Sequence, residues 1–219
     1  ATNFGWVKIN FGETGFFRTA YSKELLEKLV KPVQNKVLSS RDRLGIIRDL
    51  FALAEAGTIP TTDALEFLKA YKNEDNYTVW LEIATGLARL EQLFPEDRLR
   101  GNLNKLILDL FSPTFKRLGW TKKTKELHTD TLLRSLTISR LGRSGDQKII
   151  TEARKKFLLI QKGKHISPDI RGAIYSIIAT CGSIREYQIL IRMYKKEVLH
   201  EEKNRIGNAL GDFKNPKIL

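Results

Sequence analysis

Residues 39–57 read SSRDRLGIIRDLFALAEAG, and this stretch decides the fold class. Ser39 and Asp42 have the spacing of a capping box, in which a hydroxyl and a carboxylate satisfy the free N–H groups of a first helical turn. Gly57 stands where a helix would end. Between these signals, apolar side chains recur at the spacing of one helical face, at Leu44, Ile47, Leu50, Phe51 and Ala54. The stretch predicts an amphipathic helix that buries one face.

The same pattern fills the chain from residue 22 to residue 210. Caps such as Asn76 and the pair Ser167-Pro168 begin further runs of apolar residues at helical spacing. The predicted helices cover residues 22–31, 61–71, 76–90, 95–110, 127–141, 146–162, 167–182, 183–196 and 199–210. Helices joined by short turns, with no strands between them, predict a mostly α fold of stacked helix pairs of the HEAT or armadillo type, an α-α superhelix.

The first 21 residues follow a different pattern. Residues 6–10, WVKIN, alternate between apolar and polar side chains, and residues 16–21, FFRTAY, can pair with them. Gly12 and Gly15 lie between the two runs and suit a turn. The sequence therefore predicts a short β-hairpin before the helices. Two strands alone are only marginally stable in water, so we expect a further sheet or domain to cover their aromatic side chains.

The chain is basic, with a net charge of +13 over 219 residues, a length that allows one or two domains. The excess is spread along the chain with some bias to the last third. The densest clusters, at 122–123, 154–156 and 195–196, each have an acidic residue within a few positions. Phosphate-binding surfaces concentrate charge and add aromatic side chains that stack on bases, and neither feature is clear here. We expect a solvated basic surface and no nucleic-acid partner.

Two further features concern the cellular compartment. No stretch approaches the roughly 20 consecutive apolar residues that span a bilayer, so we expect no membrane partner. Cys181 is the single cysteine and cannot form a disulfide within the chain, which favours a reducing compartment. Together these features predict a cytoplasmic protein.

The residue types that carry catalysis do not form a recognisable set. The three histidines, His128, His165 and His200, are far apart in the sequence. Residues 200–204, HEEKN, resemble the H-E-x-x-H zinc motif, but Asn204 stands where the second histidine is needed. The sequence also lacks a phosphate loop, a nucleophile elbow and a Cys-x-x-Cys pair. We expect no catalytic residue, no metal ligand and no cofactor in this chain.

Several segments resemble one known family, in the order in which that family has them. They read NFGETGFFRTAY (10–21), LSSRDR and DLFALAEAG (within 38–57), YTVW (77–80), LGW (118–120) and PDIRGAIY (168–175). These segments are similar to motifs of the aminopeptidase N-like zinc aminopeptidases, which include puromycin-sensitive aminopeptidase and the tricorn-interacting factors. Thr19 departs from the family's valine. The zinc-binding helix of the family and its substrate-anchoring G-x-M-E-N segment lie upstream of these motifs and are not in this chain.

The resemblance implies a division of the chain and a role for it. Residues 1–21 would end a small β domain, and residues 22–219 would form a helical-repeat C-terminal domain that is truncated at its end. In the parent enzyme such a domain covers the catalytic domain of the same polypeptide and controls the access of peptide substrates to a zinc site elsewhere, without catalysis of its own. The competing hypothesis is a stand-alone HEAT-like scaffold that binds other proteins.

Arg134, Arg171 and Arg205 are the candidate substrate-facing residues. A guanidinium can hold the carboxylate end of a peptide in two places at once. The alternative for Arg171, as for the charged residues within 42–49, is a helix cap or an ion pair between helices. Tyr175 is expected to be a core residue.

Overall fold

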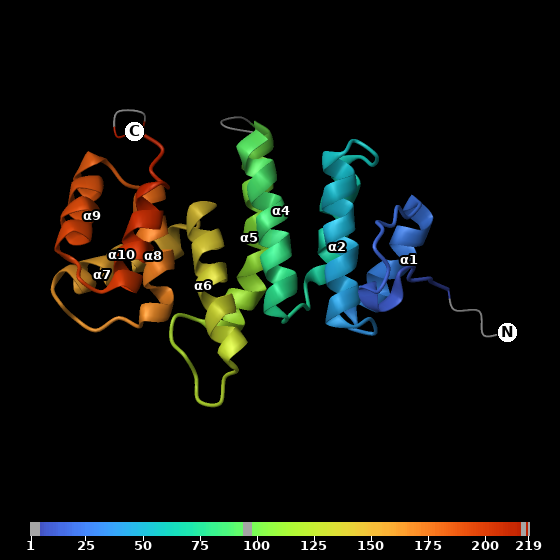
Figure 1. The fold of residues 1–219 in the computed structure, drawn as a ribbon, viewed down its shortest axis with the longest axis horizontal. Coiled ribbons are helices and arrows are strands. Elements are labelled where there is room, and N and C mark those ends of the chain that lie inside the picture. Colours follow the sequence, from blue (N-terminus) through green and yellow to red (C-terminus); the bar gives the residue numbers. More distant parts are fainter. Residues whose placement is uncertain (1–4, 94–97, 216–217, 219) are drawn as a thin grey trace. The chain divides into compact units, whose positions relative to one another are not determined.

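The computed structural model describes residues 5–93, 98–215 and 218, and the regular elements within these ranges are all helices (Figure 1). The predicted mostly α fold of stacked helix pairs is confirmed. The helices divide into two compact units, Ala1–Gly101 and Asn102–Leu219, which we call unit 1 and unit 2. Among the helices described, none is long and apolar enough to cross a membrane.

Unit 1 is built around a pair of long helices. In chain order it contains η1 (Phe11–Glu13), α1 (Lys23–Gln34), α2 (Ser40–Glu55), α3 (Thr61–Phe67), η2 (Leu68–Tyr71) and α4 (Tyr77–Leu93). α2 packs against α3 and α4, while α1 packs against α3 and η2. Trp80 is fully buried in this core. A Cβ atom at Gly86 of α4 would lie 2.4 Å from the ring of Phe51, so the close contact between α2 and α4 depends on the absence of a side chain there.

α2 begins and ends where its sequence predicts. The Ser39 hydroxyl oxygen accepts a hydrogen bond from the backbone N–H of Asp42 (3.1 Å), and Gly57 has a φ of 70°, which favours glycine. The Asp42 carboxylate does not complete the capping box, however. It accepts hydrogen bonds from the Ser39 hydroxyl (2.6 Å) and from the backbone N–H of Gly12 (2.6 Å). Asp42 therefore joins the N-terminal segment to the helix.

The predicted β-hairpin is wrong. Residues 8–21, which we call the strap, contain no strand and lie against α2 instead. The backbone N–H of Thr19 donates to the Asp49 carboxylate of α2 (3.0 Å), and a φ of 55° at Asn10 places that residue in the left-handed helical region, where a strand cannot continue. The hairpin is absent because acidic side chains of α2 accept the hydrogen bonds that a partner strand would accept.

Charged side chains hold the strap on α2. The Glu13 carboxylate lies 2.8 Å from Nζ of Lys8 and 2.8 Å from Nη2 of Arg48. Gly45 leaves room for this carboxylate, because a Cβ atom there would lie 2.0 Å from it. The strap turns its large apolar side chains outward, and these are Ile9, Phe11, Phe16 and Phe17. The polar side of the strap is therefore fixed, and its aromatic side faces solvent.

Unit 2 is centred on one buried helix. It contains most of α5 (Arg98–Leu118), followed by α6 (His128–Arg143), α7 (Gln147–Gln161), α8 (Pro168–Thr180), α9 (Ile184–Lys196) and α10 (His200–Leu210). The predicted start of α5 at residue 95 lies outside the described residues. α8 packs against α6, α7, α9 and α10. Gly142 of α6 allows one of these contacts, because a Cβ atom there would lie 2.4 Å from the side chain of Ile177.

The chain after α10 folds back onto unit 2. The Asp212 carboxylate accepts hydrogen bonds from Arg143 of α6 (2.5 Å) and from the hydroxyl of Ser176 of α8 (2.6 Å). The ring of Phe213 packs edge-on against Tyr187 of α9, with the ring centroids 5.4 Å apart. These contacts connect α6, α8 and α9 through the residues that follow α10, and they hold the end of unit 2 in place.

Candidate binding site

Glu202 of α10 is the centre of a buried polar network in unit 2. The residue is 3% exposed, and its carboxylate accepts hydrogen bonds from the Tyr175 hydroxyl (2.5 Å) and from Nη1 of Arg205 (2.9 Å). Nη1 of Arg171 lies 3.3 Å from the same carboxylate, while Nε of Arg171 donates to the backbone carbonyl of Ile166 (2.9 Å). Burial, together with the neighbouring Glu202 carboxylate, raises the pKa of Tyr175, so its hydroxyl stays a hydrogen-bond donor.

Helical spacing in the sequence assembles this network. Arg171 and Tyr175 are four residues apart on α8, and Glu202 and Arg205 are three residues apart on α10, so each pair shares one helix face. α8 and α10 pack against each other, which brings the two faces together. A carboxylate buried without such partners would strongly destabilise the fold, so the two donors and the ion pair with Arg171 are needed for the packing of α10.

A pocket of about 330 Å³ opens beside the network. Arg171, Tyr175 and Glu202 form one wall. The rest of the lining comes from the end of α7, the loop after it and the end of α9, and consists of Ile160, Gly163, Lys164, Met193, Lys196 and Glu197. The pocket therefore combines two apolar side chains, three cations and two carboxylates. Its size lies at the lower end of the range typical of small-ligand sites, which begins at roughly 300 Å³.

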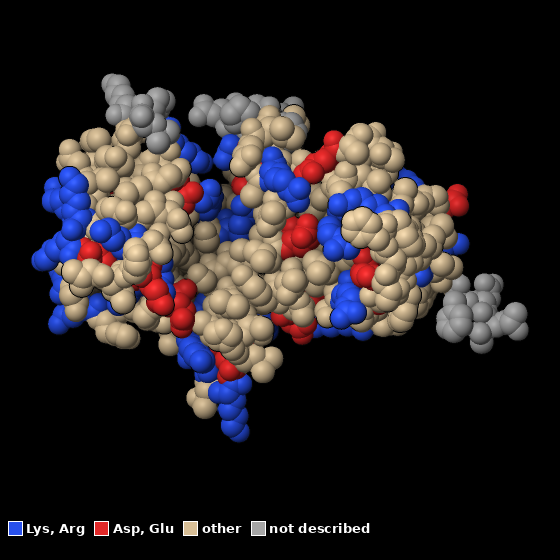
Figure 2. All heavy atoms as spheres, viewed as in Figure 1, with Lys and Arg blue, Asp and Glu red and all other residues tan. Residues whose placement is uncertain are grey.

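Both carboxylates of this pocket have hydrogen-bond partners, whereas two of its three cations form no ion pair with the described residues. Glu202 is held by the hydrogen bonds from Tyr175 and Arg205 and by the ion pair with Arg171. The Glu197 carboxylate accepts hydrogen bonds from the backbone N–H groups of Val198 and Leu199, both at 2.9 Å. Within the described ranges, Lys164 and Lys196 have no carboxylate within ion-pair distance. Basic side chains are also visible over α7 and α9 in the space-filling view (Figure 2). The pocket is therefore suited to an anionic group.

Arg134 lies elsewhere in unit 2. It is 2% exposed, and its guanidinium donates to the Glu126 carboxylate and to the backbone carbonyl of Leu118 (3.4 Å). Burial alone would raise the pKa of Glu126, but the hydrogen bond from Arg134, a backbone hydrogen bond at Lys123 and the positive charges of both residues together lower that pKa. Arg134 thus fastens the loop between α5 and α6. Of the three predicted arginines, Arg171 and Arg205 meet at Glu202, and Arg134 does not join them.

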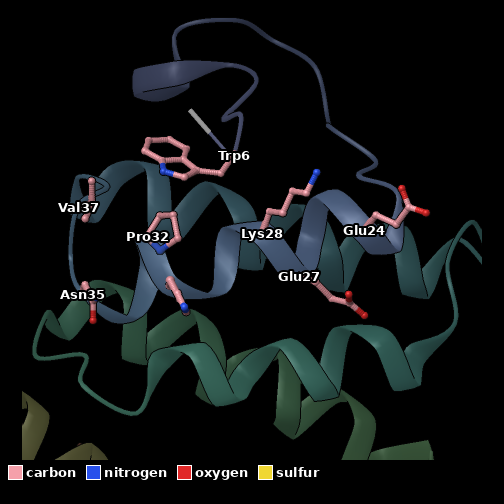
Figure 3. Close-up of a pocket in the computed structure, with 9 residues that line it drawn as sticks. Trp6, Glu24, Glu27, Lys28, Pro32, Asn35 and Val37 are labelled. Atoms are coloured by element: carbon pink, nitrogen blue, oxygen red, sulfur yellow. The ribbon is translucent and has the colours of Figure 1, made fainter. Parts of the chain in front are cut away.

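A larger groove of about 770 Å³ lies in unit 1, between α1 and the chain that precedes the strap (Figure 3). Trp6 lies over Pro32 and near Val37 at one end, and Lys28 and Glu24 project from α1 further along (Figure 3). Two lysines and two glutamates line the groove, so its charges balance. The groove offers an apolar end, but its charges do not favour either sign of ligand. The pocket of unit 2 is the better candidate for a specific site.

The histidines do not fit a zinc site. His128, His165 and His200 are each exposed, and they lie at the start of α6, after α7 and at the start of α10. In the part of the chain that the structure describes, no group of three His, Cys, Asp or Glu side chains is placed to hold a metal ion. A catalytic zinc site needs three protein ligands around an open position. This set of residues does not supply them.

Comparison with known proteins identifies the family of the chain. Residues 6–219 match the family described as the ERAP1-like C-terminal domain. The chain belongs to this family. This ERAP1-like C-terminal domain is 32% identical to aminopeptidase M1-A of Oryza sativa subsp. japonica and 31% identical to puromycin-sensitive aminopeptidase of Caenorhabditis elegans, in each case over 98% of the chain. It is 32% identical to alanine/arginine aminopeptidase of Saccharomyces cerevisiae over 99% of the chain.

The ERAP1-like C-terminal domain spans about a quarter of the length of these relatives, namely 25%, 23% and 26% in the same order. The predicted relationship to the C-terminal domain of aminopeptidase N-like enzymes is therefore confirmed. The motifs that carried it, such as PDIRGAIY at 168–175, contain Arg171 and Tyr175 of the Glu202 network.

Only part of the site was predicted from the sequence. Tyr175 is a core residue as expected, at 1% exposed, but its hydroxyl also serves the network. Glu202, Lys164 and Lys196 were missed. The three-residue spacing of Glu202 and Arg205 was a usable signal, because such a pair shares a helix face. For the two lysines the sequence carries no such signal, because they come from a loop and from the end of a different helix.

Proposed function

We propose that this ERAP1-like C-terminal domain is the accessory domain of a larger zinc aminopeptidase, in which it covers the active site and controls which peptides reach it. The observation that carries the proposal is the alignment: nearly the whole chain matches about a quarter of relatives that are named as aminopeptidases. Covering an active site excludes water and restricts substrates, which is a common role of mobile domains in enzymes.

The catalytic part of the same polypeptide is the partner that we propose for the strap. Phe11, Phe16 and Phe17 are exposed on its outer side. Neighbouring exposed aromatic side chains mark a surface that another part of a protein covers. In this proposal residues 1–21 end a small β domain of the enzyme, and residues 22–219 form the helical domain that follows it.

We propose that peptide substrates contact unit 2. The pocket beside Arg171 supports this, because it offers cations and apolar side chains together. Arg171, Arg205 and Arg134 are the proposed substrate-facing residues. All three would first have to exchange a present carboxylate partner, Glu202 for Arg171 and Arg205 and Glu126 for Arg134, for a peptide carboxylate.

Hydrolysis and zinc belong, in this proposal, to the rest of the enzyme. The dispersed, exposed histidines support the expectation that the chain alone neither binds zinc stoichiometrically nor cleaves aminoacyl reporters. We propose the cytoplasm as its compartment, since Cys181 is a free thiol.

The experiment uses the longer polypeptide encoded by the gene, with a protease site inserted before residue 1. The rate of hydrolysis of a single-residue reporter and of peptides of increasing length is measured before and after the chain is cut free and removed. We expect hydrolysis of the short reporter to persist and the preference among peptide lengths to disappear, because the cover is gone.

Two results would contradict the proposal. An unchanged length preference after removal of the chain would exclude a role in access. A gene that begins directly before residue 1, with no H-E-x-x-H segment upstream, would instead favour the stand-alone scaffold. The enzymatic comparison uses a sample that is cut but not separated as its control, so that any effect of the protease itself is subtracted.

A further inference from the structure

We propose that the loop between α5 and α6, residues 119–127, is an interaction surface that binds an acidic segment of a partner protein. We call these residues the basic loop. Lys122, Lys123 and Lys125 pair with the carboxylates of the segment, and Leu127 contacts an apolar side chain beside them. None of these residues lines the pocket of unit 2, so the inference is independent of that pocket and of the proposed function.

The basic loop projects from unit 2. It extends beyond the ends of α5 and α6 (Figure 1), and Lys and Arg side chains gather on the projection at the lower edge of the space-filling view (Figure 2). Its five consecutive residues 121–125 are all exposed. Small-molecule sites are concave, so a projection of this kind does not enclose a small ligand. It can, however, fit against an extended segment of another protein.

The acidic residues beside the basic loop do not neutralise it. The carboxylate of Glu126, within the loop, is paired with the guanidinium of Arg134, which is 2% exposed. Asp130 of α6 lies 2.9 Å from Nη1 of Arg117, in the last turn of α5. Both acids that follow the lysines in the sequence therefore have arginine partners in the structure.

The three lysines are left without counter-charges. Lys122 and Lys125 form no ion pair with a described residue, and Nζ of Lys123 donates to a neutral group, the backbone carbonyl of Arg117 (2.6 Å). Three uncompensated positive charges thus lie within the four residues 122–125. Like charges at such short separations repel each other, and a partner rich in carboxylates relieves this repulsion.

The base of the basic loop is fixed by packing. Trp120 packs edge-on against Phe115 of α5, with the ring centroids 6.1 Å apart, and Nζ of Lys156 of α7 lies 5.3 Å from the centre of the Trp120 ring. At the other end, the pair of Arg134 and Glu126 ties the loop to α6. Binding to a loop that is already ordered costs less conformational entropy than binding to one that must first be ordered.

The same contacts disfavour other anionic partners. Unpaired bases of nucleic acids stack on free aromatic side chains, but Trp120, the one aromatic residue in the sequence of the loop, is engaged with Phe115 and Lys156. Basic clusters that bind anionic lipids usually contain about four to eight Lys or Arg residues. Residues 121–125 contain three lysines and no apolar side chain that could enter a bilayer.

The remaining side chains of the basic loop suit a protein partner. Thr121 and Thr124 are exposed, and their hydroxyl groups can donate hydrogen bonds to carboxylates. Leu127 is 70% exposed where the loop meets α6. Protein interfaces combine an apolar contact of this kind with a polar rim. The basic loop therefore fits a segment in which several Asp or Glu residues flank one large apolar side chain.

The test is a titration of the isotope-labelled 219-residue chain, followed by amide chemical shifts in NMR spectra at low and at physiological ionic strength. The acidic probe is acetyl-Asp-Glu-Glu-Leu-Glu-Asp-amide, and the control peptide has Asn or Gln in place of each acid. Both peptides are capped, so neither has a free carboxyl end. We expect the acidic peptide to shift the signals of residues 119–127, to bind about tenfold more tightly than the control, and to weaken as salt is added.

Matched variants separate the basic loop from the overall charge of the chain. Replacing any one of the three lysines within 122–125 by glutamine should weaken binding about two- to fivefold, the effect of one exposed ion pair, and replacing all three should weaken it about tenfold or more. The control variant removes three exposed lysines of α7 and α9 and lowers the net charge equally: Lys148→Gln, Lys155→Gln and Lys195→Gln. It should weaken binding by no more than about twofold. All six lysines are exposed, so the far-UV circular dichroism spectrum should be the same for every variant.

Four results would overturn the proposal. Equal binding of the two peptides, or no binding of either, would exclude an acidic partner. Equal losses for the two triple variants would mean that net charge alone attracts the peptide. Binding of phosphatidylserine vesicles or of a short DNA duplex that needs the loop lysines, and is tighter than binding of the acidic peptide, would replace the protein partner by a lipid or a nucleic acid. None of these results bears on the length preference that tests the proposed function.

Discussion

Each unit of the molecule buries a glutamate among arginine and tyrosine side chains, but the two networks differ in how far they are closed. In unit 1, Glu74 pairs with Nε and Nη2 of Arg43 at 2.6 and 2.9 Å and accepts the backbone N–H groups of Asp75 and Asn76. The Tyr71 hydroxyl donates to the carbonyl of Arg43 (2.7 Å). The hydrogen bonds that Arg43 donates to the Glu74 carboxylate raise the pKa of Arg43.

In unit 2, Glu202 has a similar set of donors but lies beside a pocket. Three pockets of unit 1, one of them the groove beside α1, include neither Glu74 nor Arg43 in their linings. A buried charge therefore does not by itself mark a functional site. A buried ion pair can be wholly structural. The features that distinguish unit 2 are an open pocket and two lysines, Lys164 and Lys196, that have no ion-pair partner among the described residues. The comparison can be tested with one substitution, glutamate to glutamine, made in each network.

The largest effect is expected for Glu74→Gln. The carboxylate now serves four donors, whereas a glutamine offers a single acceptor oxygen and adds an N–H₂ group that faces other donors. The substitution leaves Arg43 buried without its counter-charge, and we expect the free energy of unfolding of unit 1 to fall by about 3–5 kcal/mol. Urea unfolding, with amide hydrogen exchange of α4 to localise the loss, measures it.

Two further variants test whether the loss comes from the uncompensated charge. Replacing the pair together, with Arg43→Met and Glu74→Leu, should recover much of the lost stability, because the uncompensated charge is then absent. Glu66→Gln removes an exposed carboxylate of α3 that lies 3.9 Å from Lys69, and it should change stability by less than about 0.5 kcal/mol. A loss for Glu74→Gln no larger than that for Glu66→Gln would show that the closed network is not needed.

Glu202→Gln should have a smaller effect on stability. The glutamine oxygen can still accept from Tyr175, and the released Arg171 can reach water in the pocket, so we expect a loss of about 1.5–3 kcal/mol. Urea unfolding measures the loss. A loss as large as that for Glu74→Gln would mean that the unit 2 network is equally closed.

Much of the fold could be predicted from the sequence, because helical signals are local. The cap at Ser39, the left-handed Gly57 and the apolar spacing between them are contained within one segment, and the structure has them as predicted. The strap could not be predicted in this way. Its alternation of apolar and polar side chains is typical of a strand, but its hydrogen-bond partners, Asp42 and Asp49, are some 30 residues away on α2.

The candidate site shows the same limit. Arg171 and Arg205 were selected from the sequence, because arginine suits a carboxylate, and the structure brings them to one residue, Glu202. What the sequence could not give is which cations already have partners. That depends on the packing of α8 against α10 and on the loop after α7. In the structure Arg171 is paired with the Glu202 carboxylate, whereas Lys164 and Lys196 have no ion-pair partner among the described residues.

The smallest effect is expected for Glu126→Gln, which extends the comparison to a third arginine–glutamate pair. Side-chain exposure rises from 1% at Glu74 through 4% at Glu202 to 10% at Glu126, so the loss of stability at pH 7 should be about 1–2 kcal/mol. Because Arg134 lowers the pKa of Glu126 in the folded state, the pair stabilises the fold above the unfolded pKa of about 4.3 and loses this contribution as the pH falls through the folded value.

The difference in unfolding free energy between the parent chain and Glu126→Gln should therefore shrink when urea unfolding is repeated at pH values below about 4, since the parent also loses the charge there. Glu201→Gln is the matched control, because its carboxylate is 78% exposed and forms only a 3.6 Å contact with Arg205. That control should differ little from the parent at either pH. If the difference in unfolding free energy between the parent chain and Glu126→Gln stays constant on acidification, the shape of the side chain, and not its charge, holds Arg134 and the loop between α5 and α6.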